Sequence, residues 1–157
     1  MGYNFEPSEI SASFGLVQLK KFKKFNKTRN RNFYSHLKFF KNFDSFFIHP
    51  KILNNVKTNF LAYPVIIKKN NFFSRKELQI YLENEGIQTR PIFSGNILRH
   101  PAFKNLNFSK NKIDTFKKSD FIMQNGLLIG CHQGLSNKNI AYMHKIIKKF
   151  ILKKKLK

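Results

Sequence analysis

The second half of the chain alternates short apolar runs with segments of helical periodicity, and this alternation sets the class of fold. β-Branched and aromatic residues predict strands over 60–67, 87–93 and 127–129. Helices are predicted over 114–124 and after Ser74 and Ser136. Helices interleaved with a few short strands indicate an α+β fold, in which the helices pack on a small sheet.

Local signals mark where some of these elements begin and end. Ser74 and Glu77 have the spacing of a capping box, in which each side chain bonds the backbone amide of the other, and Gly86 ends that helix. Pro64 cannot donate to a sheet ladder, so it favours an edge strand or a bulge. Residues 94–103 are predicted to form a loop with a short helical turn.

A helical segment precedes this domain. Ile10, Phe14 and Val17 recur at helical spacing, and many of the lysines between them and residue 42 fall on the other face. We expect two helices, or one bent helix, over 7–42, and a loop over 44–58. The chain then divides into a helical segment over 1–43, an α+β domain over 59–152 and a basic tail over 153–157.

The composition is strongly basic. Thirty Lys and Arg against eight Asp and Glu give a net charge of +22, which would draw the chain to any polyanion. The basic residues are mostly lysines and accompany many Asn, Phe and Ile, all of which have A/T-rich codons, so base bias in the genome accounts for the set. Specific readers of nucleic acids use arginines for base contacts, and arginine is sparse here. We therefore expect no specific nucleic-acid partner.

Several classes of site and location are disfavoured. The chain has no apolar run long enough to span a bilayer and no leader at Met1, so we expect a cytoplasmic protein without membrane contact. Cys131 is the single cysteine, which excludes an internal disulfide and makes a zinc site a poor prospect. We expect its thiol to be buried.

One segment gathers polar side chains at a predicted strand end. Arg90, Asn96 and His100 lie within 89–101, and strand ends followed by loops are where ligands bind in layered folds. A guanidinium there suits a diphosphate, because its fork of donors matches phosphate oxygens. The alternative is that Arg90 pairs with a nearby carboxylate and has only a structural role.

Three segments, in order along the chain, carry a resemblance to a known family. The first joins Gly2–Phe5 with Gly15–Leu19, the second joins Gly86–Ile92 with Ser94–Asn96, and the third joins Asn125–Gly130 with His132–Gln133. They are similar to the motifs "GYN…GLxQL", "GIxTRPI…GN" and "NGxxxGxHQ" of the DegT/StrS family of nucleotide-sugar aminotransferases and 3-dehydratases. Ser94–Asn96 resembles the 3-dehydratase branch.

The resemblance implies the small C-terminal domain of a fold-type-I enzyme that uses pyridoxal phosphate (PLP). In the family, the Schiff-base lysine, or the histidine that replaces it in 3-dehydratases, lies upstream of the GYN segment in a large domain. We therefore assign no catalytic residue to this chain and do not expect it to hold PLP alone. By similarity, Tyr3 and Asn4 contact the phosphate of the cofactor across a homodimer. Glu6 and Ser11 depart from the family pattern, and Glu6 reverses a charge beside that phosphate.

Two functions follow as hypotheses. In the first, the chain shapes the nucleotide-sugar pocket of a 3-dehydratase or sugar aminotransferase of lipopolysaccharide and O-antigen deoxysugar biosynthesis, and is inactive without a large domain. In this hypothesis Arg90 holds a phosphate, while Asn96 and His100 bond sugar or phosphate oxygens. In the alternative, the chain is a basic module without enzymatic activity that binds nucleic acid or anionic surfaces.

Overall fold

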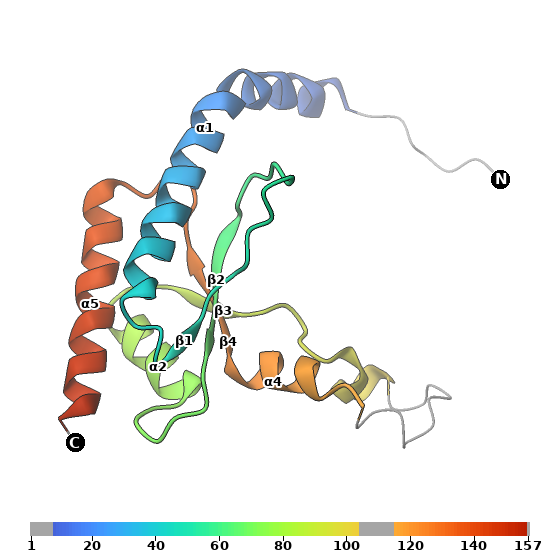
Figure 1. Cartoon of the computed structure of the whole chain (residues 1–157). Helices are drawn as coiled ribbons and strands as arrows, with labels where there is room; N and C mark the ends of the chain where they lie inside the picture. The colour runs from blue at the N-terminus through green and yellow to red at the C-terminus, as the bar shows by residue number, and fades with distance from the viewer. Residues whose placement is uncertain (1–7, 104–114, 157) are drawn as a thin grey trace.

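The computed structural model describes residues 8–103 and 115–156 (Figure 1). Its main elements are α1 (Glu9–Lys41), β1 (Phe47–Ile48), β2 (Ala62–Ile67), α2 (Arg75–Asn84), β3 (Thr89–Pro91), α4 (Lys117–Asn125), β4 (Gly126–Gly130) and α5 (Asn137–Lys155). Two short 3-10 turns, η1 (Ile97–Arg99) and η2 (Pro101–Phe103), follow β3. The α+β class predicted from the sequence is confirmed.

The four strands form one antiparallel sheet in the order β1-β2-β4-β3. Helices α1, α2 and α5 pack on one face of this sheet, while α4 lies at one end of the other face (Figure 1). The face opposite the three helices is therefore covered only in part by described residues. This difference between the two faces positions the candidate site.

Alternation along the strands fills the covered face with apolar side chains. Tyr63, Val65 and Ile67 of β2 are buried, with Leu127 and Ile129 of β4 beside them. Helix α1 adds aromatic rings to this layer, and α5 adds one face of apolar residues: Ile140, Met143, Ile146, Ile147, Phe150 and Ile151. The helix predicted after Ser136 is confirmed.

Helix α1 is one continuous helix of 33 residues. Its second half belongs to the core, because Phe33 and Phe40 are buried against β2. Its first half leaves the apolar stripe in solvent, with Ile10 73% and Phe14 69% exposed. In Figure 1 this half extends beyond the sheet and away from α5.

Pro64 does not mark an edge strand, because β2 lies between β1 and β4. The amide of Lys68 donates to the carbonyl of Phe46 at 2.7 Å, so the backbone nitrogen of Pro64, four residues earlier, points toward β1. Continuing the β1–β2 register places Pro50 opposite Pro64. Neither proline can donate, which explains why β1 ends after Ile48. This short strand lies where the sequence predicted only a loop.

The predicted helix caps are present. The hydroxyl of Ser74 accepts from the amide of Glu77 and the Glu77 carboxylate bonds the Ser74 amide; Ser136 forms the same box with Asn139. Helix α5 continues through Lys155. Asn125 ends α4 and Gly126 begins β4, so the helix joins the strand directly.

Candidate functional site

Arg90 lies on the sheet face that the three helices leave open. Its neighbour Thr89 is buried on the covered face and donates to a carboxylate oxygen of Glu83 at 2.8 Å. Because side chains alternate along a strand, Arg90 points the other way. In register with it across the sheet lie Leu128 of β4 and Pro64 of β2, both half-buried. The open face thus offers an apolar row that ends in a guanidinium at the edge strand.

The Arg90 guanidinium is exposed and makes no hydrogen bond or ion pair with any described residue. Another arginine of the same segment behaves differently. Arg99 donates to both carboxylate oxygens of Asp120, at 3.1 and 2.8 Å. Among the described residues no carboxylate pairs with Arg90, so its charge is available to a ligand.

Asn96 is buried and holds the loop after β3. Its Oδ1 accepts from the amide of Leu98 at 3.1 Å, and its Nδ2 donates to Asp120 at 2.7 Å. The hydrogen bonds from Arg99 and Asn96 lower the pKa of Asp120. One carboxylate on α4 therefore ties down both ends of η1.

His100 follows η1 and is also tied to the loop. Its Nε2 donates to the carbonyl of Ser94 at 2.6 Å, so the neutral ring presents Nδ1 as an acceptor. Of the three residues predicted to face a substrate, Asn96 and His100 share the η1 turn, and only Arg90 is without a described partner. Whether any of them contacts a substrate stays a prediction.

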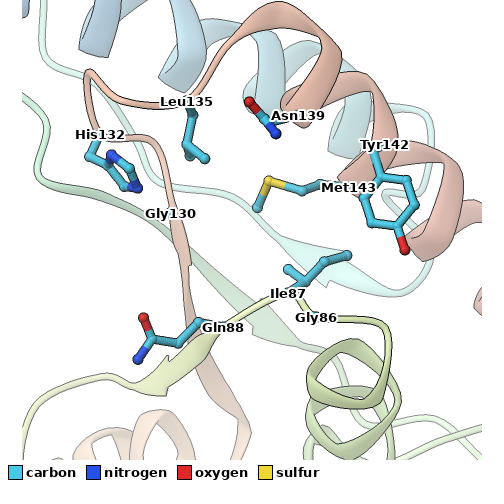
Figure 2. A pocket seen from close by; sticks show the side chains of 9 residues that line it. All are labelled: Gly86, Ile87, Gln88, Gly130, His132, Leu135, Asn139, Tyr142 and Met143. Carbon is cyan, nitrogen blue, oxygen red and sulfur yellow. The ribbon is translucent and has the colours of Figure 1, made fainter.

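A hollow of about 350 Å³ lies between the start of β3, the end of β4 and α5 (Figure 2). His132, Asn139 and Tyr142 line one side of it, and Gln88 lies on the strand side. The His132 Nδ1 accepts from the amide of Gly134 at 3.1 Å, which leaves Nε2 as the donor. This hollow is a second polar site beside the sheet edge.

Polar side chains of α1 clamp the loop that leads from β4 to α5. The buried Asn32 donates to the carbonyls of His132 and Leu135, at 3.1 and 3.2 Å. Arg29 donates to the side-chain oxygen of Gln133 at 2.7 Å. These contacts bridge about a hundred residues of sequence, and they hold one rim of the hollow in place.

Two histidines join α1, β4 and α5. The Nε2 of His36 faces the Gly130 carbonyl at 3.0 Å and must donate, so its Nδ1 accepts from Nε2 of His144, also at 3.0 Å. Burial lowers the pKa of His36 to about 4, although its bond to Gly130 opposes the shift. Burial, and then the charge of His36, lower the pKa of His144 to about 4. Both rings are neutral near pH 7.

None of the described lysines is buried. That the chain does not hold PLP alone stays a prediction. Tyr3 and Asn4, the predicted cofactor contacts, lie outside the described residues, as does Glu6. In the described ranges no three His, Cys, Asp or Glu side chains gather to hold a metal.

Cys131 is buried, as predicted. Burial raises its pKa to about 11, and the thiol points to the carbonyl of Phe60. No helix in the described part of the chain has the length and apolarity needed to cross a bilayer.

Sequence reasoning missed Asn32, His36 and Asp120. Asn32 and His36 lie on a helix face that periodicity assigns to the core, and their partners are remote in sequence. The one available signal was that polar residues interrupt an apolar stripe. Asp120 was one acidic residue in a basic helix, and only the fold brings it to Arg99.

Known proteins share sequence with nearly the whole of this chain. Residues 1–148 match the model of the DegT/DnrJ/EryC1/StrS aminotransferase family. The GDP-4-keto-6-deoxy-D-mannose 3-dehydratase of Escherichia coli O55:H7 is 32% identical over 152 residues, covering 94% of this chain and 37% of that protein. The lipopolysaccharide biosynthesis protein RfbH of Salmonella typhimurium is 28% identical over 144 residues, covering 91% of this chain and 32% of that protein.

A solved structure shares the fold as well as sequence. The crystal structure of GDP-4-keto-6-deoxymannose-3-dehydratase with a trapped PLP-glutamate geminal diamine matches with a TM-score of 0.78 and 29% identity, over 94% of this chain and 37% of that chain. This chain thus spans about a third of the length of the relatives it matches. The small-domain fold expected from the sequence motifs is confirmed, and the chain belongs to the DegT/DnrJ/EryC1/StrS aminotransferase family.

Proposed function

We propose that this chain is the small domain of a PLP-dependent nucleotide-sugar 3-dehydratase, or of a sugar aminotransferase of the same family, in lipopolysaccharide deoxysugar biosynthesis. The observation that carries the proposal is Arg90: a guanidinium without a described partner, on the open face of the sheet, within a motif of the family. The proteins named as its relatives include two dehydratases of GDP-4-keto-6-deoxymannose. The chain shapes the substrate pocket and does not turn over substrate alone.

Each residue of the segment has a distinct role in this proposal. Arg90 binds a phosphate of the nucleotide-sugar through its fork of N–H donors. His100 offers Nδ1 to a sugar hydroxyl. Asn96 is buried in the η1 turn, so we assign it first to holding the loop, with any contact to a substrate oxygen through its remaining hydrogen-bonding capacity.

A large domain and a second subunit complete the pocket. The cofactor supplies the electron sink for chemistry at the sugar, and Tyr3 and Asn4 reach the cofactor phosphate of the partner subunit in a homodimer. The exposed stripe of Ile10, Phe14 and Val17 on α1 is the surface that we assign to the contact with the large domain, because an exposed row of apolar side chains marks a protein–protein interface. We place the assembly in the cytoplasm.

The basic-module alternative is not favoured, because family membership accounts for all three sequence motifs that the alternative leaves unexplained. The lysine excess still predicts weak binding of polyanions. That binding should fall steeply with salt and show no preference for sequence.

Co-expression tests the proposal. The chain is expressed with the large-domain part of a family 3-dehydratase, and consumption of GDP-4-keto-6-deoxymannose is measured. Arg90→Ala should lower kcat/KM about ten- to a hundredfold, because a charged hydrogen bond of about 1.5–3 kcal/mol is lost. Arg90→Lys should also be poor, since an ammonium cannot reproduce the guanidinium fork.

Arg75→Ala is the matched control. Arg75 is an arginine at the start of α2 whose guanidinium donates to Gln124 and Gln79 within the protein. This variant should leave kcat/KM nearly unchanged. An active assembly in which Arg90→Ala has no effect would contradict the phosphate role.

A further inference from the structure

Phe93 has a backbone conformation that phenylalanine rarely adopts. Its φ is +45°, and among the described residues it is the one non-glycine with a positive φ. Phe93 and Ser94 are the central residues of a tight turn, closed by the Gly95 amide, which donates to the Ile92 carbonyl at 3.1 Å. Such turn positions favour Gly, Asn or Asp, because a bulky side chain is strained there.

The ring of Phe93 gains no burial in return, because the residue is 86% exposed. The residues around Phe93 are closely packed. A Cβ at Gly95, whose φ is +62°, would overlap the side chain of Met123, and Ile92 packs where a Cβ on Gly126 would stand. The turn is closely packed at Gly95, and it displays an aromatic ring that neither backbone preference nor packing explains.

We infer that Phe93 stacks on the nucleobase of the nucleotide-sugar and fixes where the nucleotide lies. The inference rests on the proposed function and adds a recognition element to the same site. Phe93 follows Arg90 by three positions, so their Cα atoms are at most roughly 11 Å apart. A guanidinium and an exposed ring this close together match the two ends of a nucleoside diphosphate, the phosphates and the base.

The base of the nucleotide-sugar suits contact with the Phe93 ring better than its phosphates or its sugar. Phosphates and sugar hydroxyls require hydrogen-bond partners, which a phenyl ring lacks. Every base presents a flat π-face, and stacking on an aromatic side chain contributes a large share of nucleotide binding. Phe93 thus gives affinity for the nucleoside half of the substrate without selecting one base.

The chain contains no tryptophan, so Phe93→Trp introduces a single fluorescent reporter. Titrating the purified chain of this variant with GDP or dTDP should quench the indole, while pyrophosphate, which lacks a base, should not. Phe14→Trp, at an exposed position of α1, is the matched control and should respond to neither. An indole at position 93 that is unchanged while GDP binds, as measured by calorimetry, would overturn the inference.

Binding measurements separate this inference from the proposed function. Phe93→Leu should weaken GDP about 5- to 100-fold and leave pyrophosphate within about twofold, whereas Phe93→Tyr should keep the affinity for GDP. If Arg90→Ala abolishes GDP binding but Phe93→Leu does not alter it, the stacking role fails and the proposed function stands. If the wild-type chain and the co-expressed assembly bind no nucleotide, both fail.

Thermal unfolding distinguishes the stacking role of Phe93 from a structural role, because the two roles predict opposite changes in the Tm of Phe93→Gly. Phe93→Gly relieves the strained φ and removes a ring that packs on little, so its Tm should equal or exceed that of the wild type by up to about 4 °C. A Tm that falls by several degrees would show that Phe93 holds the fold together, and would contradict the stacking role.

Discussion

The two halves of α1 have the same apolar periodicity and opposite surroundings. In the second half, Phe33 and Phe40 are buried against Tyr63 of the sheet. In the first half, Ile10 and Phe14 point into solvent at the same helical spacing. Periodicity therefore predicts which face of a helix is apolar, but the rest of the fold decides whether that face finds a partner within the chain. The same contrast separates the covered and open faces of the sheet.

The largest effect should come from truncating one aromatic in each half of α1. Phe33→Ala removes a ring that packs against Phe60 and Tyr63, and should lower the free energy of unfolding by about 3–5 kcal/mol. Phe14→Ala should change it by no more than about 0.5 kcal/mol in the chain alone. Urea unfolding of the two variants measures this. Equal losses would mean that the first half is packed in solution.

The histidine pair should make the packed half sensitive to acid. Because the folded pKa of His36 is near 4 and that of an unfolded histidine is near 6.5, the unfolded chain binds more protons between these values. Stability is thus complete above about pH 6.5 and falls as the pH drops toward 4, by about 3 kcal/mol for His36. Urea midpoints between pH 7 and 5, where most carboxylates stay ionised, follow this loss.

His36→Gln isolates the contribution. The glutamine cannot titrate, so the loss of stability between pH 7 and 5 should become smaller in this variant, and the part that remains belongs to His144. His132→Gln, which changes an exposed ring, should keep the slope of the wild type. If His36→Gln retains the full slope, the buried pair is not its source.

The smallest effect concerns the helix starts. Ser136→Ala removes a capping box from α5 and should cost about 1 kcal/mol, since an amide at the helix start loses its partner. Ser8 precedes α1 but its side chain caps no described amide. Ser8→Ala should therefore leave thermal unfolding unchanged, and a loss equal to that of Ser136→Ala would refute the difference between the two starts.

Much of the fold could be predicted because its signals are local. The residues of the capping box at Ser74 lie within a few positions of one another in the sequence. The apolar stripe of α5 is likewise visible within one short stretch of sequence. The long-range parts could not be derived in this way: that β2 is an inner strand depends on β1, which pairs two residues only, next to two prolines. Of the candidate site, the segment after β3 was found from residue types. The tie between Asp120 and Arg99 depends on how α4 folds back.

The central claim is that a large domain completes this chain and covers the exposed first half of α1. Hydrogen–deuterium exchange along α1 tests this claim most directly. Amides of 9–22 are compared with those of 33–40, in the chain alone and in a complex co-purified with the large-domain part of a family 3-dehydratase. The complex should protect 9–22 strongly and change 33–40 little, and Phe14→Glu should prevent it from forming. No complex, or a complex without protection of 9–22, would contradict the account.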